Sequence, residues 1–165
     1  MVKNNRYALK YRRRREGRTD YKKRLNLLKG RGARVVVRKT NAHTIVQFIE
    51  YLPDGDVVKA HADTKHLASK GWSASTSSIP AAYLAGYLAG VQAKKAGLSN
   101  AVLDMGRQQT SHGGRIFAAV KGVIDAGVDV PVSENALPSE ERLVGEHISE
   151  GLKKEVEALK KKVNA

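Results

Sequence analysis

The first 31 residues of the chain carry the side chains best suited to binding a polyanion. Arg12–Arg15 follow one another directly, and four adjacent positive charges either stay in water or meet negative charge. Tyr7, Tyr11 and Tyr21 are interleaved with these and other cations. Aromatic rings stack on unpaired bases while guanidinium and ammonium groups neutralise phosphates, so the combination favours irregular RNA as the ligand. A solvated tail without a ligand is the alternative interpretation.

The charge of the whole chain is concentrated in this region. The net charge is +14, and residues 1–39 hold 16 Lys and Arg against two acidic residues. Residues 40–165 hold 14 basic and 14 acidic residues and are therefore neutral. A neutral body with a basic arm is typical of nucleic-acid binding. A membrane partner is disfavoured because the arm lacks apolar anchors, and groove reading of DNA is disfavoured because no helix-turn-helix or zinc-finger spacing occurs.

A second candidate site for an anion is the segment Ser111-His112-Gly113-Gly114-Arg115. Backbone N–H groups of glycines at a helix start form a concave nest for phosphate, and the fork of Arg115 suits the same ligand. The segment is not a Walker loop, because it has no Gly-Lys-Ser/Thr. Gly113, Gly114 and Arg115 are therefore a candidate phosphate nest, with a buried turn as the alternative.

Three aspartates at the ends of predicted elements raise the alternative of a metal-dependent nuclease. Clustered Asp63, Asp104 and Asp125 would be able to hold two Mg²⁺ ions for phosphodiester cleavage. The same residues also suit helix caps and turns, which is the interpretation that we favour. The chain has no cysteine and its five histidines are scattered, so no zinc site is expected. We therefore expect no enzymatic activity, no cofactor and no small-molecule substrate.

These groups need a scaffold, and the sequence from residue 33 predicts a sheet. Three runs rich in β-branched residues, ARVVVRKT, HTIVQFIEYL and DVVKAHADT, are separated by turn signals at residues 40–42 and 53–55. Such short connections predict an antiparallel three-stranded meander. Alternation places Arg34, Val36 and Arg38 on one face of the first run. We expect this face of the sheet to be partly polar and cationic, opposite a packed face.

Helices and a further strand follow the meander. A hydroxyl-rich loop leads into a helix over residues 81–96, and residues 113–127 predict an amphipathic helix. Residues 100–106 between them predict a short buried strand. Gly86 and Gly90 are four residues apart and are expected to bring the first helix close to the sheet. The fold class is therefore α/β, with a mixed sheet built from the antiparallel meander plus the further strand, packed with helices.

The chain divides into three regions by composition. Residues 1–32 form an extended basic RNA-binding arm, in which residues 20–29 predict a short helix whose leucines face the body. Residues 33–137 form the α/β body. Residues 138–165 form a helical C-terminal extension with a narrow apolar stripe, which we expect to dock lightly or to meet a partner. No segment resembles a secretory signal or a transmembrane helix, so we expect a soluble intracellular protein.

Beyond these patterns, the sequence resembles one known family. The large-subunit ribosomal protein numbered eighteen in the universal scheme is similar to this chain in three blocks: RVVVRKTNAHTIVQFIEYLPDGD, SASTSSIPAAYLAGYLAG and GGRIFAAVKGVIDAGVDVPVSENALPSEERLVGEHI. The resemblance runs from about residue 4 to residue 150, and the ordered combination of blocks is specific although no single block is. The length and the NALPSEERLVGEHI extension resemble archaeal members.

The resemblance implies a structural role in the ribosome. That family binds 5S rRNA, also touches 23S rRNA, and forms the central protuberance of the large subunit with universal large-subunit protein five. The resemblance therefore implies a cytoplasmic ribosomal protein that helps to attach 5S rRNA to 23S rRNA. It gives the helix from Leu152 no role beyond a contact with protein or RNA. A general nucleic-acid-compacting protein is the alternative that the residues alone leave open.

The RNA-binding residues implied by the resemblance lie in the arm and on the exposed face of the meander. The arm is expected to thread between RNA elements, and the hydroxyl-rich loop at residues 73–78 is expected to add backbone contacts. The expected RNA-binding residues are Arg6, Tyr7, Lys10, Tyr11, Arg12, Arg13, Arg14, Arg15, Arg18, Tyr21, Lys22, Lys23, Arg24, Lys29, Arg31, Arg34, Arg38, Asn41 and Gln47.

Overall fold

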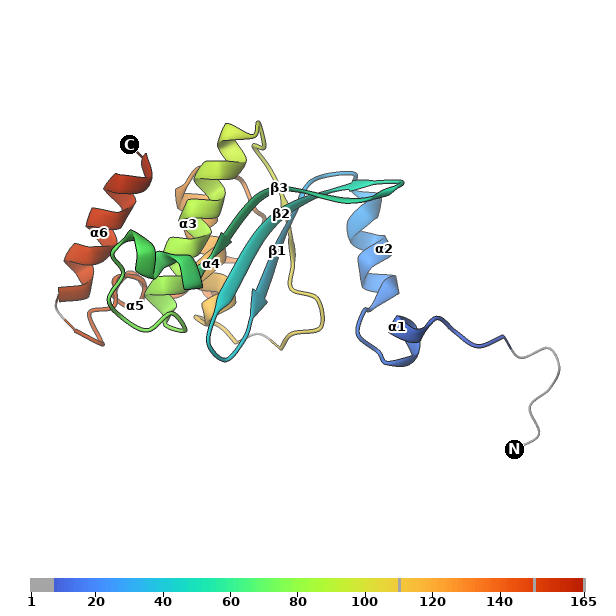
Figure 1. Cartoon of the computed structure of the whole chain (residues 1–165), viewed down its shortest axis with the longest axis horizontal. Helices are drawn as coiled ribbons and strands as arrows, with labels where there is room; N and C mark the ends of the chain where they lie inside the picture. Colours follow the sequence, from blue (N-terminus) through green and yellow to red (C-terminus); the bar gives the residue numbers. More distant parts are fainter. Residues whose placement is uncertain (1–7, 110, 150, 165) are drawn as a thin grey trace.

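A computed structural model of the chain describes residues 8–109, 111–149 and 151–164. Figure 1 shows the arrangement: a central sheet, with α3 and α4 against one side, α6 outside α3, and α2 on the opposite side. In chain order the elements are α1 (Arg12–Arg15), α2 (Tyr21–Lys29), β1 (Arg34–Lys39), β2 (Thr44–Leu52), β3 (Gly55–Asp63), η1 (Thr64–Lys70), α3 (Ile79–Lys95), β4 (Val102–Asp104), α4 (Arg115–Asp125), η2 (Glu134–Ala136), α5 (Glu140–Val144) and α6 (Gly151–Asn164).

The sheet is mixed, as predicted, and has the order β3-β2-β1-β4. β1 pairs antiparallel with β2, and β2 pairs antiparallel with β3, which confirms the meander. β4 pairs parallel with β1, with Arg34 opposite Val102 and Val36 opposite Asp104. The predicted short buried strand is present but only partly buried, because β4 lies at an edge and leaves Val102 exposed while Asp104 is buried.

One face of the sheet forms the core, and the other, which we call the open face, lies away from α3 and α4. Val35, Val37, Val46 and Phe48 alternate along β1 and β2, are fully buried and belong to the core cluster beneath α3 and α4. The intervening residues point to the open face, which therefore receives Arg34 and Arg38, as alternation predicts. The register is fixed because a one-residue slip would turn four buried side chains toward water.

Small residues bring α3 into close contact with α4. Gly86 and Gly90 were expected to bring α3 close to the sheet, but they face α4. A Cβ on Gly86 would fall on the backbone carbonyl of Ala119 in α4, and a Cβ on Gly90 would lie 2.6 Å from Ala126 Cβ. Gly122 of α4 faces the backbone of Tyr83 in the same way. The glycines therefore bring the two helices together, and the two helices cover the sheet as one layer.

The C-terminal extension differs from the prediction in its depth of packing. The extension contains two helices, because α5 ends at Gly145. This glycine adopts φ 80°, a left-handed conformation that suits glycine and ends a helix. α6 then packs on α3 through Leu152, Val156 and Leu159, all of which are buried in the main core. The expectation of light docking is wrong, since this stripe is narrow but fully covered.

The arm folds back along the open side of the sheet and contains two helices. Asp20 caps α2 by accepting a hydrogen bond from the backbone N of Lys23 at 3.0 Å, which confirms the helix predicted there. Leu27 and Leu28 are half-buried, but Leu25 is 57% exposed and does not face the body. None of the helices in the described part of the chain has the length and apolarity needed to cross a bilayer.

Candidate RNA interface

The arm presents most of its cations to water. α1 is one turn made only of Arg12–Arg15, and every one of these side chains is exposed. Glu16 accepts from Arg12 at 2.7 Å and from Arg18 at 2.8 Å, which holds two guanidinium groups beside the turn. Tyr11 is 88% exposed and is therefore available for stacking. Of the predicted RNA-binding residues, Arg6 and Tyr7 lie outside the described residues.

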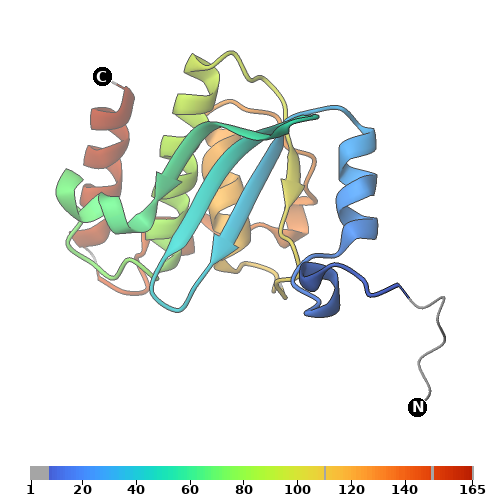
Figure 2. The same cartoon turned by 45° about the vertical axis from the view of Figure 1, so that its right-hand side comes forward.

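Three contacts between the body and the arm hold the arm beside the sheet. Figure 2 shows the helices of the arm, in blue, next to the sheet. Arg24 of α2 pairs with Asp56 of β3 at 2.8 Å, and Lys23 Nζ donates to the carbonyl of Gly106 at 3.3 Å. Arg107 donates to the carbonyl of Gly17 in the loop between α1 and α2. Residues 17–24 are therefore placed by the Asp56 side chain of β3 and by a backbone carbonyl and a side chain of the loop after β4.

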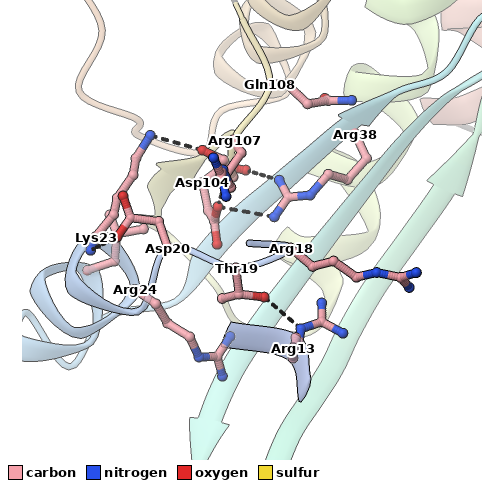
Figure 3. Close-up of a pocket in the computed structure, with 12 residues that line it drawn as sticks. Arg13, Arg18, Thr19, Asp20, Lys23, Arg24, Arg38, Asp104, Arg107 and Gln108 are labelled. Carbon is pink, nitrogen blue, oxygen red and sulfur yellow. Dashed lines mark hydrogen bonds and ion pairs between the residues drawn. The ribbon is translucent and has the colours of Figure 1, made fainter. Parts of the chain in front are cut away.

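A cleft of about 380 Å³ lies between the arm and the open end of the sheet (Figure 3). We call it the arm cleft. Six cationic residues line the arm cleft: Arg13, Arg18, Lys23, Arg24, Arg38 and Arg107. Two carboxylates, Asp20 and Asp104, also line it, together with Thr19, whose hydroxyl accepts from Arg13 Nε at 2.6 Å. Because the cations outnumber the carboxylates, the arm cleft is strongly electropositive.

Arg34 was expected to contact RNA, but the structure buries it. Its side chain is only 2% exposed. Its guanidinium donates to Asp104 at 3.2 Å and to Asp56 at 2.9 Å. A cation buried between two carboxylates has no free charge to offer to a phosphate, so Arg34 is a structural residue.

Arg38 lies on the same face but closer to solvent, with 37% of its side chain exposed. It donates to the backbone carbonyl of Asp104 at 2.6 Å and to the Asp104 carboxylate at 3.2 Å. The N–H of Gly106 also donates to that carboxylate, at 2.8 Å. Asp104 thereby fixes both Arg38 and the loop after β4, so it organises one wall of the arm cleft (Figure 3).

Asp56 joins the arm to the core electrostatically. Partial burial favours the neutral acid, but the hydrogen bonds from Arg24 and Arg34 outweigh burial and hold the pKa of Asp56 below its usual 3.8. The carboxylate is therefore charged at neutral pH. It lies between an arm cation and a buried cation, which makes it the shared anion of a chain that runs Arg24–Asp56–Arg34–Asp104–Arg38.

Most of the remaining predicted RNA-binding residues are exposed. Gln47 is half-buried on the open face. The exposed ones are Lys10, Tyr21, Lys22, Lys29, Arg31 and Asn41.

The side chains of the hydroxyl-rich loop at residues 73–78 make hydrogen bonds within the protein. Ser73 donates to Glu155 at 2.7 Å, and Thr76 donates to the carbonyl of Ala42 at 2.9 Å. The expectation of RNA contacts by this loop has no support from these hydrogen bonds.

The candidate phosphate nest is also occupied by the chain itself. The N–H of Gly113 donates to the carbonyl of Ala136 at 3.0 Å, and the N–H of Gly114 donates to the carbonyl of Ser111 at 3.1 Å. Arg115 donates to the carbonyl of Thr40 at 3.1 Å. The buried-turn alternative is therefore the better description of the two glycines, because their donors are already satisfied.

The three aspartates of the nuclease alternative do not form one site. Asp63 caps η1 by accepting from Lys65 N, and Asp104 is tied to two arginines. Asp125 accepts from the Tyr83 hydroxyl at 2.7 Å and pairs with Lys121 at 3.0 Å. Within residues 8–109, 111–149 and 151–164, no group of His, Asp and Glu is arranged to hold a metal ion.

Sequence reasoning missed Arg107 and Gln108 as walls of the arm cleft. Both stand alone after the short strand β4, where no periodic pattern or motif marks them. They reach the site because β4 pairs in parallel with β1 and delivers its following loop to the same end of the sheet as Arg38. Predicting these two residues would have required knowing that β4 pairs in parallel with β1.

Comparison with known proteins identifies the family of this chain. The family model described as "Ribosomal large subunit proteins 60S L5, and 50S L18" matches residues 5–98 and 91–133. The chain belongs to this family. A large ribosomal subunit protein uL18 of Korarchaeum cryptofilum (strain OPF8) is 55% identical, over 90% of this chain and 76% of that protein. The uL18 protein of Methanocorpusculum labreanum is 46% identical, over 97% of this chain and 95% of that protein.

Membership of the uL18 family confirms the resemblance to the universal family eighteen. A third relative, the uL18 protein of Methanoculleus marisnigri, is 49% identical over 91% of this chain and 86% of its own length. The relatives named here are archaeal, as the resemblance implied. The chain is accordingly a structural protein of the large ribosomal subunit and not an enzyme, which decides against the nuclease alternative.

Proposed function

We propose that this uL18 protein binds 5S rRNA and helps to attach it to 23S rRNA in the central protuberance of the large subunit. The arm cleft carries the proposal: six cations from the arm, from β1 and from the loop after β4 converge around two carboxylates. Such an excess of fixed positive charge suits closely spaced phosphates of folded RNA. Universal large-subunit protein five is the neighbouring protein that the proposal includes as a partner.

The arm and the body contribute differently to binding. The exposed arginines of α1 neutralise phosphates and release counterions, which makes the affinity fall steeply with salt. Tyr11 and Tyr21 offer exposed rings for stacking on unpaired bases. The body supplies shape and register, because its contacts at Gly17, Lys23 and Arg24 already orient residues 17–24 before RNA arrives.

The proposal is tested by titrating 5S rRNA with the chain over a series of salt concentrations, with duplex DNA of equal length as competitor. We expect one-to-one binding that survives the DNA. Changing Arg12–Arg15 to Gln is expected to weaken binding at least about 100-fold and to reduce the salt slope by about 3, at roughly 0.7–0.9 per phosphate contact. Deletion of residues 1–31 is expected to have at least the same effect.

A matched variant removes the same charge elsewhere. Lys95, Lys154, Lys161 and Lys162 are exposed lysines on α3 and α6, and their replacement by Gln is expected to change the affinity less than fivefold. An arm variant that binds as tightly as the lysine variant would refute the role of the arm. Equal competition by duplex DNA would instead support the nucleic-acid-compacting alternative.

A further inference from the structure

A second electropositive cleft lies on the other side of the sheet from the arm cleft. It has a volume of about 410 Å³ and is bounded by the end of β1, the starts of α3 and α4, and the segment around α5. We call it the end cleft. Lys39, Arg115 and Arg142 bring three basic side chains to it, and Ser77 and Ser111 add hydroxyl groups. None of the residues that line the end cleft lines the arm cleft.

The side chains, and not the glycine turn, give this cleft its character. The N–H groups of Gly113 and Gly114 are satisfied within the chain, so they hold no ligand. Among the described residues, no Asp or Glu lines the end cleft. Within residues 8–109, 111–149 and 151–164, the side chains of Lys39 and Arg142 have no ion-pair or hydrogen-bond partner. Unneutralised cations around a concave surface favour an anionic ligand.

Arg115 is held in a position from which it can bind such a ligand. One nitrogen of its guanidinium donates to the carbonyl of Thr40 at 3.1 Å, which fixes the side chain at the end of β1. A guanidinium has five N–H donors, so most of them are left for an anion. Arg115 is therefore preorganised to bind a phosphate, whereas the side chains of Lys39 and Arg142 are free to adjust their positions toward it.

The end cleft and the arm cleft meet at one strand end. Arg38 lines the arm cleft, and the next residue, Lys39, lines the end cleft. Successive residues of a strand point to opposite faces, so the two clefts lie on the two faces of the same sheet end. Gln108, which lines the arm cleft, exchanges hydrogen bonds of 2.9 and 2.5 Å with the backbone of Lys39. Gln108 thus ties the lining of the arm cleft to the backbone of a residue that lines the end cleft.

We propose that the end cleft binds a backbone phosphate of the same RNA whose other phosphates occupy the arm cleft. The RNA strand then runs around the carboxyl-terminal end of β1, with Arg38 on one face and Lys39 on the other. This inference rests on the proposed function for the identity of the RNA. It extends that function by placing a contact on the side of the sheet that α3 and α4 cover.

The test compares two double variants of the full chain that lose the same charge. Lys39→Gln with Arg142→Gln removes two cations from the end cleft, and Lys154→Gln with Lys161→Gln removes two from the exposed side of α6. With 5S rRNA we expect the end-cleft pair to weaken binding about tenfold and to lower the salt slope by about 1–2, as for two lost phosphate contacts. The α6 pair is expected to change affinity less than twofold. Equal effects of the two pairs would overturn the proposal.

Protection of Lys39 gives a second, independent readout. Lys39 and Lys161 of the wild-type chain are acetylated with a water-soluble reagent, and the extent is read by mass spectrometry with and without RNA. We expect RNA to protect Lys39 and not Lys161. Protection of Lys39 by millimolar inorganic phosphate, with no further effect of RNA, would assign a small-anion site and contradict the proposal.

Failure of the proposed function and failure of this inference give different results. If the wild-type chain binds duplex DNA as tightly as 5S rRNA, the proposed function fails. The end-cleft pair is then measured on that DNA, where an unchanged salt slope would overturn the phosphate contact and a lowered slope would support it. If the chain binds neither nucleic acid, both proposals fail.

Discussion

Arg34 and Arg38 are four residues apart on one face of β1, yet their guanidinium groups serve different purposes. Arg34 is enclosed between Asp104 and Asp56, whereas Arg38 uses Asp104 only as a support and keeps part of its surface in the arm cleft. Two cations on one strand therefore share an acid, and depth decides which of them remains available to a phosphate. The same sequence pattern produces one buried structural residue and one cation that stays partly exposed in the arm cleft.

This difference predicts opposite outcomes for two substitutions. Arg34→Met leaves Asp104 and Asp56 without their buried partner, so we expect the free energy of unfolding to fall by about 3–5 kcal/mol in urea denaturation. Its RNA affinity, measured under conditions where it is folded, is expected to stay within about threefold of wild type. Arg14→Met on the exposed turn α1 is expected to weaken RNA binding and leave stability unchanged. A stable Arg34 variant that binds RNA poorly would reverse these assignments.

Asp56 makes stability depend on pH in a defined direction. Its pKa is lower in the folded protein than its usual 3.8, so the folded state favours the ionised carboxylate. That contribution to stability is present above about pH 3.8 and is lost as the pH falls through the lower, folded-state pKa. We expect wild type to be more stable than Asp56→Asn at pH 7 and the difference to shrink below pH 4. A difference that is constant from pH 7 to pH 3 would contradict this.

At the scale of elements, the close contact of α3 with α4 is what allows two helices to cover a four-stranded sheet. Gly86 and Gly122 permit the backbones to approach at two points, each against a carbonyl of the other helix. Alanine is a better helix former than glycine by about 1 kcal/mol, so propensity alone would favour replacement. The packing requirement is larger, because neither backbone can move without separating the layer from the sheet.

Gly86→Ala is accordingly expected to destabilise the protein by about 1–3 kcal/mol, despite its gain in helix propensity. The measurement is the melting temperature followed by circular dichroism, where a clear decrease is expected. Gly32→Ala is the control, since the atom nearest to a new Cβ there would be the carbonyl oxygen of Gly30 at 3.9 Å. If both variants melt at the wild-type temperature, the two helices do not need the glycine at this crossing.

Local pattern was sufficient to predict the meander and the helices α2, α3 and α4, but not α1, the break between α5 and α6, or the partners of these elements. The alternation in β1 and β2 follows from neighbouring residues. The burial of Arg34 depends on Asp104, which lies 70 residues away and is placed by a three-residue parallel strand. The spacing of Gly86 and Gly90 predicted a close approach without saying to which surface. Long-range pairing, not local propensity, was therefore the missing information.

At the scale of the whole molecule, the basic arm and the C-terminal helix lie on opposite sides of the central layers. The arm lies at one end and the C-terminal helix α6 at the other, with the sheet and the layer of α3 and α4 between them (Figure 1). α6 lies beyond residues 5–133, which the family model matches, yet it contributes three side chains to the main core. The described structure therefore completes its core with a segment outside the family match, while the arm cleft and the end cleft lie in the matched part or next to it.

The position of β1 in the sheet order has a consequence for the growing polypeptide. β1, β2 and β3 are complete by residue 63, but the second neighbour of β1 arrives only with residues 102–104. At translation rates of about 5–20 residues per second, one edge of β1 stays unpaired for roughly 2–8 s after the meander has left the ribosome. During that interval Arg34 has Asp56 as a partner but lacks Asp104. A nascent chain of this protein thus spends seconds with an open strand and a half-compensated cation, and synthesis of residue 104 closes both at once.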